Sequence, residues 1–131
     1  MRAAAPISVE LGRVGKSVVD AAFNVHRRLG PGLLESVYET CLCIELGKRS
    51  LSFKRQVALP IVYDEVTLPG ALRIDVLVAD SVVVEVKASE MMLPVYEAQP
   101  LTYLKLSNRR LGYLINFNVA MIKSGIRRMA L

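Results

Sequence analysis

Residues 73–78 read RIDVLV and residues 82–87 read VVVEVK, and these two runs decide the fold. Both are rich in β-branched residues and place their charges at alternate positions, which is typical of two neighbouring strands. Alternation sends every second side chain to one face, so Asp75, Glu85 and Lys87 can lie together. Two carboxylates and an ammonium beside aliphatic neighbours are costly to bury unless a cation or a phosphate completes the cluster. The pattern therefore indicates a metal site for phosphodiester chemistry.

The length of the turn between the two runs decides whether this site can form. With a two-residue turn, Asp75 and Glu85 would point to opposite faces. With a three-residue turn at residues 79–81, Asp75 lies opposite Glu85, and their carboxylates are expected within roughly 6 Å because one ion has to contact both. Arg73 then lies opposite Lys87, and the other face is wholly apolar, made of Ile74, Val76, Val78, Val82, Val84 and Val86.

The composition is that of one globular domain. The chain has 131 residues, of which 53% are hydrophobic and 22% charged, enough for a single core. We therefore expect one domain over residues 1–131, with residues 1–9 as a loose lead-in. The 17 Lys and Arg against 12 Asp and Glu give a net charge of +5, which favours an anionic partner such as nucleic acid.

The sequence contains no pattern for export or membrane insertion. The first residues lack the apolar run of a signal peptide, and no later segment is long and apolar enough to span a bilayer. Cys41 and Cys43 point in different directions if they lie on a helix, which predicts buried free thiols. We expect a cytoplasmic, reducing location and no membrane partner.

Helical periodicity marks three segments. Apolar residues recur at helical spacing over residues 17–29, stop at Gly30-Pro31-Gly32 and resume to about residue 48, which predicts an N-terminal helical hairpin. A third helix is expected over residues 95–106. Pro100 fits that helix if it lies in the first turn, and otherwise it should produce a kink.

Strand-like segments make up most of the remainder. Alternating apolar residues predict a strand over residues 53–63, and turns are expected at residues 64–65 and 68–70. Residues 111–117 are typical of a buried strand. The tail over residues 119–131 is basic and aliphatic, with no element assigned to it.

A further motif upstream of the two strands is Gly32-Leu33-Leu34-Glu35-Ser36-Val37-Tyr38. Together with Asp75, with Glu85-Val86-Lys87, and with Gln99 and Tyr103 downstream, it resembles the GxxExxY family, which is similar to the PD-(D/E)XK phosphodiesterase superfamily. The resemblance runs from about residue 18 to residue 129. It implies an α/β (α+β) restriction-endonuclease-like core: a central mixed sheet of four to five strands, flanked by helices, with a magnesium-dependent nuclease site. Tyr96, where relatives would have histidine, and Pro100 depart from the family pattern.

The resemblance implies roles for individual residues. Asp75 and Glu85 would bind Mg²⁺ or Mn²⁺, with Glu35 as an outer or second-metal ligand. Lys87 would orient the attacking water or stabilise the charge of the transition state. Gln99 would complete the catalytic set by contacting a phosphate or a metal-bound water. Substrate contacts are expected from Tyr38, Tyr103, Lys105 and Arg110.

Each assignment has a structural alternative that the residues leave open. Asp75, Glu85 and Lys87 could form cross-strand ion pairs on a solvated face, which contribute about 0–1 kcal/mol. Glu35 could complement the helix dipole above a core tyrosine, Tyr38. Gln99 could be a helix-surface amide, and the basic C-terminal half could be a solvated surface rather than a phosphate-binding rim. His26, the sole histidine, is expected to be a hydrogen-bonded packing residue.

The sequence thus favours a magnesium-dependent nuclease that hydrolyses phosphodiester bonds in nucleic acid, with DNA preferred to RNA. The alternative is a catalytically silent nucleic-acid-binding or oligomeric interaction module with the same fold. A homodimer is left open.

Overall fold

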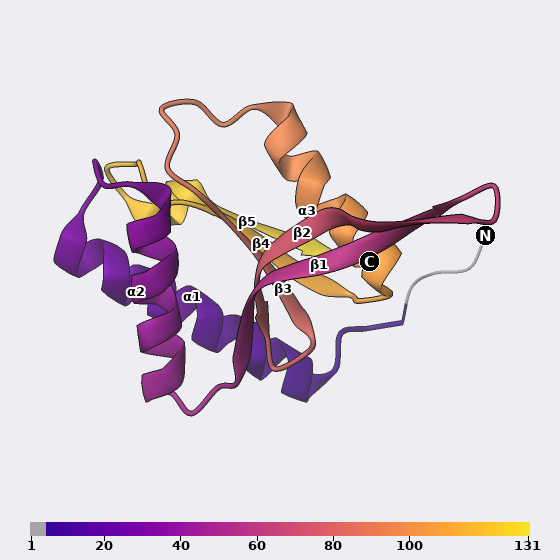
Figure 1. The fold of residues 1–131 in the computed structure, drawn as a ribbon. Coiled ribbons are helices and arrows are strands. Elements are labelled where there is room, and N and C mark those ends of the chain that lie inside the picture. The colour runs from indigo at the N-terminus through magenta and orange to yellow at the C-terminus, as the bar shows by residue number, and fades with distance from the viewer. Residues whose placement is uncertain (1–4) are drawn as a thin grey trace.

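The structure, a computed structural model, describes residues 5–131. The chain folds into a five-stranded mixed sheet with helices on both faces (Figure 1). The strands lie in chain order, and β3 and β4 are the parallel pair. This architecture confirms the predicted fold class. The elements are α1 (Val9–Leu29), α2 (Glu35–Lys48), β1 (Phe53–Tyr63), β2 (Val66–Val78), β3 (Val82–Lys87), α3 (Pro94–Ser107), β4 (Leu111–Asn116), the 3₁₀-helix η1 (Ile122–Gly125) and β5 (Ile126–Ala130).

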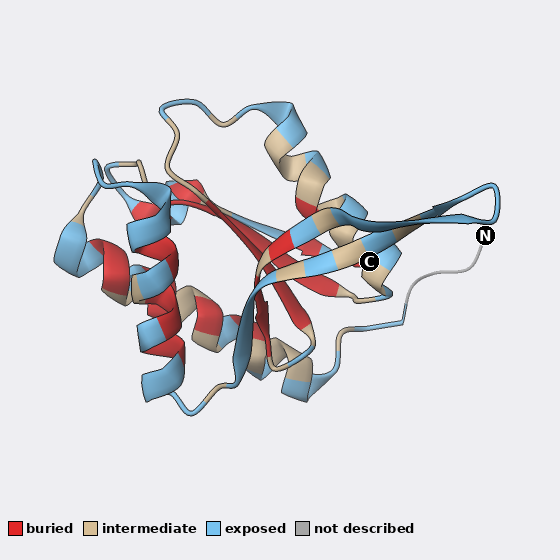
Figure 2. Ribbon diagram, in the orientation of Figure 1, coloured by how far each residue is buried: buried red, intermediate tan, exposed pale blue. Residues whose placement is uncertain are grey.

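The sheet separates two apolar cores. Helices α1 and α2 pack on one face, where β3 contributes Val82, Val84 and Val86. Helix α3 covers the other face, where Val83 packs with Leu104 of α3. Figure 2 shows that burial is concentrated on the central strands and on the sides of α1 and α2 that face them. Strand β3 is therefore buried on both faces, as its continuous apolar run requires.

The predicted apolar face is wrong at Ile74. The prediction placed this side chain with Val76 and Val78, but it packs in the α3 core with Leu77 and Val83. Ile74 and Leu77 differ by three positions, so the two-residue alternation of β2 is broken between them, beside Asp75.

Helix α1 begins earlier than the periodicity predicted. Its first residue is Val9, and the hydroxyl of Ser8 caps it by accepting a hydrogen bond from the Leu11 amide at 3.1 Å. The predicted lead-in is thus reduced to residues before the helix, and residues 1–4 lie outside the described part of the chain. The helical hairpin itself, with its break at residues 30–34, is confirmed.

Strands β1 and β2 form a long hairpin whose tip projects from the body of the molecule (Figure 1). Asp64 and Glu65 turn the chain with positive φ at both residues, as expected for a two-residue hairpin turn. The turn expected at residues 68–70 is wrong: Pro69 and Gly70 lie within β2, opposite a register shift between Leu59 and Ile61. A proline on a hairpin arm is tolerated at such an irregularity.

The C-terminal half contains two elements that the sequence analysis missed, the 3₁₀-helix η1 and strand β5. Strand β5 pairs antiparallel with β4 and closes that edge of the sheet. Helix α3 starts at Pro94, so Pro100 lies inside it and not in its first turn. Pro100 is buried there. Because proline has no amide hydrogen, the helix lacks the hydrogen bond to the carbonyl of Tyr96.

Candidate functional site

The register between β2 and β3 brings Asp75 and Glu85 together. Val78 pairs with Val82, so the turn contains three residues, as predicted. The ladder stops at Val76 and Val84, one position before the two carboxylates. There the carboxylates replace backbone carbonyls as acceptors. The Val86 amide donates to Oδ2 of Asp75 at 2.9 Å, and the Asp75 amide donates to Oε1 of Glu85 at 3.3 Å.

This arrangement also corrects the predicted pairing of Arg73. Arg73 was expected opposite Lys87 on β3, but its partner in the sheet is Ala58 of β1. The ladder between β2 and β3 ends before it, because the side chains of Asp75 and Glu85 occupy the next hydrogen-bonding positions. Arg73 is exposed and lies two residues from Asp75.

Glu85 is a buried carboxylate beside a second carboxylate. It is 4% exposed, and burial together with the nearby charge of Asp75 raises its pKa from 4.5 to about 8. The Asp75 amide and the Lys87 ammonium lower this pKa without offsetting the rise. A bound cation would supply the missing charge compensation.

The metal-free protein should therefore lose stability as the pH rises from about 4.5 to about 8. In this interval Glu85 is ionised in the unfolded chain but still protonated in the folded protein, so the free energy of unfolding falls. The contribution of Glu85 to the free energy of unfolding is complete below its ordinary pKa of 4.5 and is lost as the pH rises to its folded-state pKa of about 8. Each pKa unit corresponds to about 1.4 kcal/mol, so the fall should reach a few kcal/mol.

Urea denaturation in EDTA across this pH range measures the effect. The variant Glu85→Gln has no charge to lose and should show a flatter profile. Glu65→Gln, an exposed position at the hairpin tip, is the matched control. Parallel profiles for the wild-type protein and Glu85→Gln would contradict the prediction.

Glu35 reaches the same place from α2. It is the first residue of the helix and lines a hollow of about 470 Å³ with Asp75 and Gln56. Burial is the main cause that raises its pKa, and Asp75 adds to the rise, whereas the Lys87 ammonium and the Ala88 amide lower the pKa. The carboxylates of Glu35 and Asp75 therefore face a common space, about forty residues apart in sequence.

Helix α3 supplies the opposite side of the site. The Lys87 ammonium lies over the ring of Tyr96, 4.7 Å from its centroid. Burial raises the pKa of Tyr103, and the charges of Glu85 and Asp75 add to the rise. Gln99 lies between these two tyrosines at spacings of three and four, so all three share one helix face. Its Oε1 is buried and has no hydrogen-bond partner among the described residues, which fits an absent ligand.

Two further polar residues of the site were not found in the sequence analysis. Gln56 donates from Nε2 to Oε1 of Glu39 at 2.8 Å and, more weakly, to Oδ1 of Asp75 at 3.4 Å. Arg55 donates two hydrogen bonds to the other oxygen of Glu39, at 3.0 and 2.7 Å. Gln56 has a positive φ, which a strand pattern does not signal. These contacts hold β1 against α2 beside Asp75.

Three predicted substrate contacts are not part of the site. Lys105 is exposed on the side of α3 away from Tyr103, because two helical positions are about 200° apart. Arg110 is bound to the carbonyls of Leu131, Ala5 and Pro6, at 2.9 Å to Leu131 and 3.1 Å to Pro6. Tyr38 is fully buried and stacks on Phe117 with ring centroids 4.7 Å apart.

Tyr38 anchors the loop that precedes Glu35. Its hydroxyl donates to the Gly30 carbonyl at 2.6 Å and accepts from the Leu33 amide at 3.1 Å. Gly32, between these contacts, has φ of 101°, which favours glycine. The hydroxyl therefore donates and accepts inside the protein, and the buried Tyr38 holds the loop in place.

Replacing Tyr38 by phenylalanine should lower the free energy of unfolding by about 1–2 kcal/mol, because the Gly30 carbonyl and the Leu33 amide lose a partner at a partly buried position. Urea denaturation measures this loss. Tyr63→Phe, at the exposed hairpin tip, should change little. An unchanged stability of Tyr38→Phe would show that the hydroxyl does not hold the loop.

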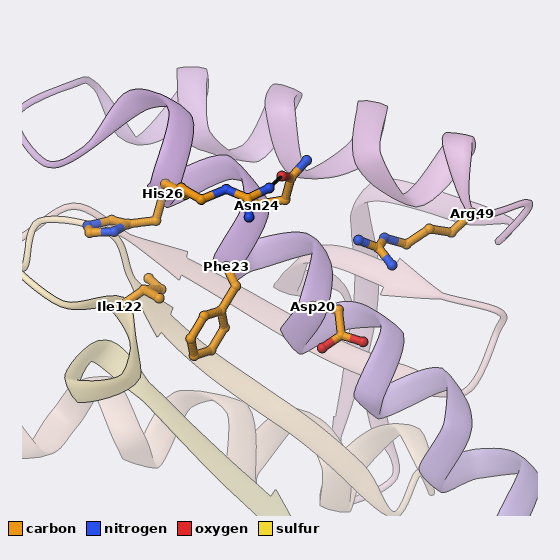
Figure 3. Close-up of a pocket in the computed structure, with 7 residues that line it drawn as sticks. Asp20, Phe23, Asn24, His26, Arg49 and Ile122 are labelled. Atoms are coloured by element: carbon orange, nitrogen blue, oxygen red, sulfur yellow. Dashed lines mark hydrogen bonds between the residues drawn. The ribbon is translucent and has the colours of Figure 1, made fainter.

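A second hollow, of about 500 Å³, lies between α1, the end of α2 and η1 (Figure 3). Asp20 and Arg49 border one end, and His26 and Ile122 the other. It shares no lining residue with the hollow at Asp75, and no carboxylate pair lines it. The candidate site is therefore the hollow at Asp75. His26 donates a hydrogen bond from Nε2 to the Val119 carbonyl at 2.7 Å, which confirms its packing role.

The cysteines show no site chemistry. Cys43 is buried and Cys41 half-buried, and both are free thiols. Burial is the main cause that raises the pKa of the Cys43 thiol to about 11, so it is protonated at neutral pH.

The donor set at Asp75 fits a divalent cation that completes its coordination with water. Within residues 5–131, no three His, Cys, Asp or Glu side chains are grouped as a ready cage for an ion. Two carboxylates are nevertheless adjacent, and each has one oxygen beyond the short backbone contact. Mg²⁺ is commonly held by one or two carboxylates, several waters and substrate phosphates. Asp75 and Glu85 could supply the two carboxylates.

The fold, a five-stranded mixed sheet flanked by helices, is consistent with a restriction-endonuclease-like nuclease class. The chain belongs to the PD-(D/E)XK nuclease superfamily, whose family model matches residues 12–129. Nucleases of this superfamily act on nucleic acid and generally use divalent metal ions. Searches of curated proteins and of solved structures found no match. The likeness to the GxxExxY family stays an interpretation of the motif. Among the described helices, none has the length and apolar character to cross a membrane.

Proposed function

We propose that the protein is a divalent-metal-dependent nuclease that hydrolyses phosphodiester bonds, with Mg²⁺ or Mn²⁺ as the ion and DNA as the preferred substrate. The observation that carries the proposal is the pairing of Asp75 and Glu85 at the end of the β2–β3 ladder. A surface ion-pair network would leave Glu85 solvated, whereas it is buried beside a second carboxylate. Such a pair is stable in its charged form only with a cation.

The residues of the site divide the work by position. Asp75 and Glu85 would hold the ion, with Glu35 as an outer ligand across the hollow. When bound, the ion neutralises the charge of the phosphate and makes a coordinated water more acidic. Lys87 would donate hydrogen bonds to the attacking water or to the phosphate oxygens, where negative charge increases in the transition state. Its position over the ring of Tyr96 fixes the ammonium at this place.

Gln99 would contact a phosphate or a metal-bound water. Its buried, unpartnered Oε1 is an acceptor and fits a coordinated water, which donates hydrogen bonds. Tyr103, on the same helix face, would border the substrate.

The substitution Lys87→Ala tests this proposal. Cleavage of a labelled oligonucleotide in Mg²⁺ should fall by about 10²-fold or more, while affinity for the same strand changes only a few-fold, since the charge is needed chiefly in the transition state. Lys105→Ala, an exposed lysine outside the site, should cleave normally. Cleavage is followed on gels with and without EDTA.

Two results would contradict the proposal that the protein is a metal-dependent nuclease. Metal-independent binding without cleavage, unchanged by Lys87→Ala, would instead identify a catalytically silent nucleic-acid-binding module. Cleavage that survives Lys87→Ala and EDTA would place the activity elsewhere.

A further inference from the structure

The two chain segments that border the candidate site carry no cation. The first lip is residues 30–39, GPGLLESVYE, and the second lip is residues 88–99, ASEMMLPVYEAQ. Both contain glutamates but no lysine or arginine. The two lips meet at the site. The Ala88 amide of the second lip and the neighbouring Lys87 ammonium lie close enough to Glu35 of the first lip to lower the pKa of its carboxyl group. Figure 1 shows the two loops, before α2 and before α3, on the same side of the molecule.

Most of the large exposed side chains of both lips are apolar, although Glu35 and Glu90 are exposed among them. Leu34 of the first lip is 74% exposed and Met91 of the second is 68% exposed. Leu33, Leu93 and Val95 are exposed beside them. Apolar surface of this kind, next to a polar site, marks a place where a ligand or partner binds. Phosphates do not fit these lips, whose only charged groups are Glu35, Glu39, Glu90 and Glu97.

Cations that could bind phosphates lie on the hairpin side of the site. Arg73 is exposed on β2, two residues from Asp75. Arg55 of β1 is on this side too, but it pairs with Glu39 of the first lip at 2.7 Å. Lys87 lies at the centre. Arg127 of β5 reaches the second lip, but there it pairs with Glu97 at 3.3 Å. The positive charge around the site is therefore one-sided.

A one-sided charge distribution discriminates between duplex and single strand. A duplex presents two phosphate backbones, so one of them would face the lips, which have no lysine or arginine of their own to neutralise it. A single strand presents one backbone, which the hairpin side can bind, and unstacked bases, which pack on apolar and aromatic side chains. Tyr96 of the second lip, whose ring lies under the Lys87 ammonium, and Tyr103 on the same helix face are partly buried aromatic side chains beside these lips.

We propose that the site takes single-stranded nucleic acid, with its phosphates along β1 and β2 and its bases against the two apolar lips. This inference rests on the proposed nuclease function and names its substrate class. The apolar side chains of the lips would contact the bases, and Arg73 and Lys87 would contact the phosphate backbone.

The test compares substrates and a lip variant. Fluorescence anisotropy in EDTA measures binding of a labelled single strand, of the blunt duplex of the same sequence, and of an abasic strand of equal length. Cleavage of the first two is measured in Mg²⁺. The lip variant is Leu34→Ser with Met91→Ser. Leu34 is the N-cap of α2 without a side-chain cap hydrogen bond, so serine there is compatible with folding. Val9→Ser is the control, because Val9 is 75% exposed and also lies at a helix start.

We expect the wild-type protein to bind and cut the single strand at least about ten-fold better than the duplex. The lip variant should lose about ten-fold in affinity for the single strand, in line with the contribution of one stacked base. It should bind the abasic strand as the wild-type protein does, and Val9→Ser should change nothing.

Equal binding and cleavage of the duplex would overturn this inference and leave the nuclease function intact. An unchanged lip variant would do the same. Dimerisation without nucleic acid that the lip variant abolishes, measured by sedimentation, would assign the lips to a second copy of the chain instead. Absence of both binding and cleavage for every strand would overturn the proposed function and this inference with it.

Discussion

Replacing Asp75 by asparagine should lower the rate of metal-dependent cleavage by about 10²- to 10³-fold. Asparagine can still accept the hydrogen bond from the Val86 amide, so the junction of β2 and β3 keeps its geometry. What is lost is the charge that holds the ion and neutralises the phosphate, and removal of one such electrostatic contribution typically costs this much. Single-turnover cleavage of a labelled oligonucleotide in Mg²⁺ measures the rate.

Asp64→Asn is the matched control for this substitution. Asp64 is exposed at the hairpin tip and has a positive φ, which asparagine also adopts readily. It should cleave as the wild-type protein does. If Asp75→Asn retained full activity in Mg²⁺, the carboxylate pair would not be the metal site.

The second large effect is expected on thermal stability. Mg²⁺ or Mn²⁺ at about 100 times its dissociation constant should stabilise the native state by about 2.7 kcal/mol, which raises the melting temperature by roughly 5–15 °C. Without the ion, and at a pH above about 8 where Glu85 is ionised, Asp75→Asn should be more stable than the wild-type protein, because the repulsion between Asp75 and Glu85 is removed. With the ion, that variant should gain little.

Differential scanning fluorimetry with a cation titration measures both halves of this prediction. Monovalent salt at matched ionic strength separates specific binding from screening. Equal shifts for the wild-type protein and Asp75→Asn would mean that the ion binds elsewhere.

The centre of the site was predictable because it depends on local parity. Charges two residues apart on each strand and an odd turn are enough to place Asp75 next to Glu85. The parity argument failed at Ile74, where the alternation of β2 breaks. The alternation pattern of a single strand signals neither that break nor the positive φ of Gln56 on the neighbouring strand.

The substrate contacts were less predictable because they depend on tertiary position. Residue type suggested that Lys105 and Arg110 bind phosphate, yet Arg110 holds the N-terminal segment against Leu131. The total charge of +5 likewise says nothing of its distribution, and the lips of the site carry none of the 17 Lys and Arg. Strand β5 was missed because the sequence of residues 126–130, IRRMA, does not alternate clearly.

The motif around Glu35 combines three separate duties that a family signature presents as one. Gly32 allows the bend, Tyr38 fastens the loop to the interior, and only Glu35 faces the hollow. A related sequence that keeps the glycine and the tyrosine but replaces the glutamate would be expected to retain the loop while its site lacks one carboxylate. The identity of that middle residue is therefore a simple criterion for separating complete sites from degenerate ones among chains that share this motif.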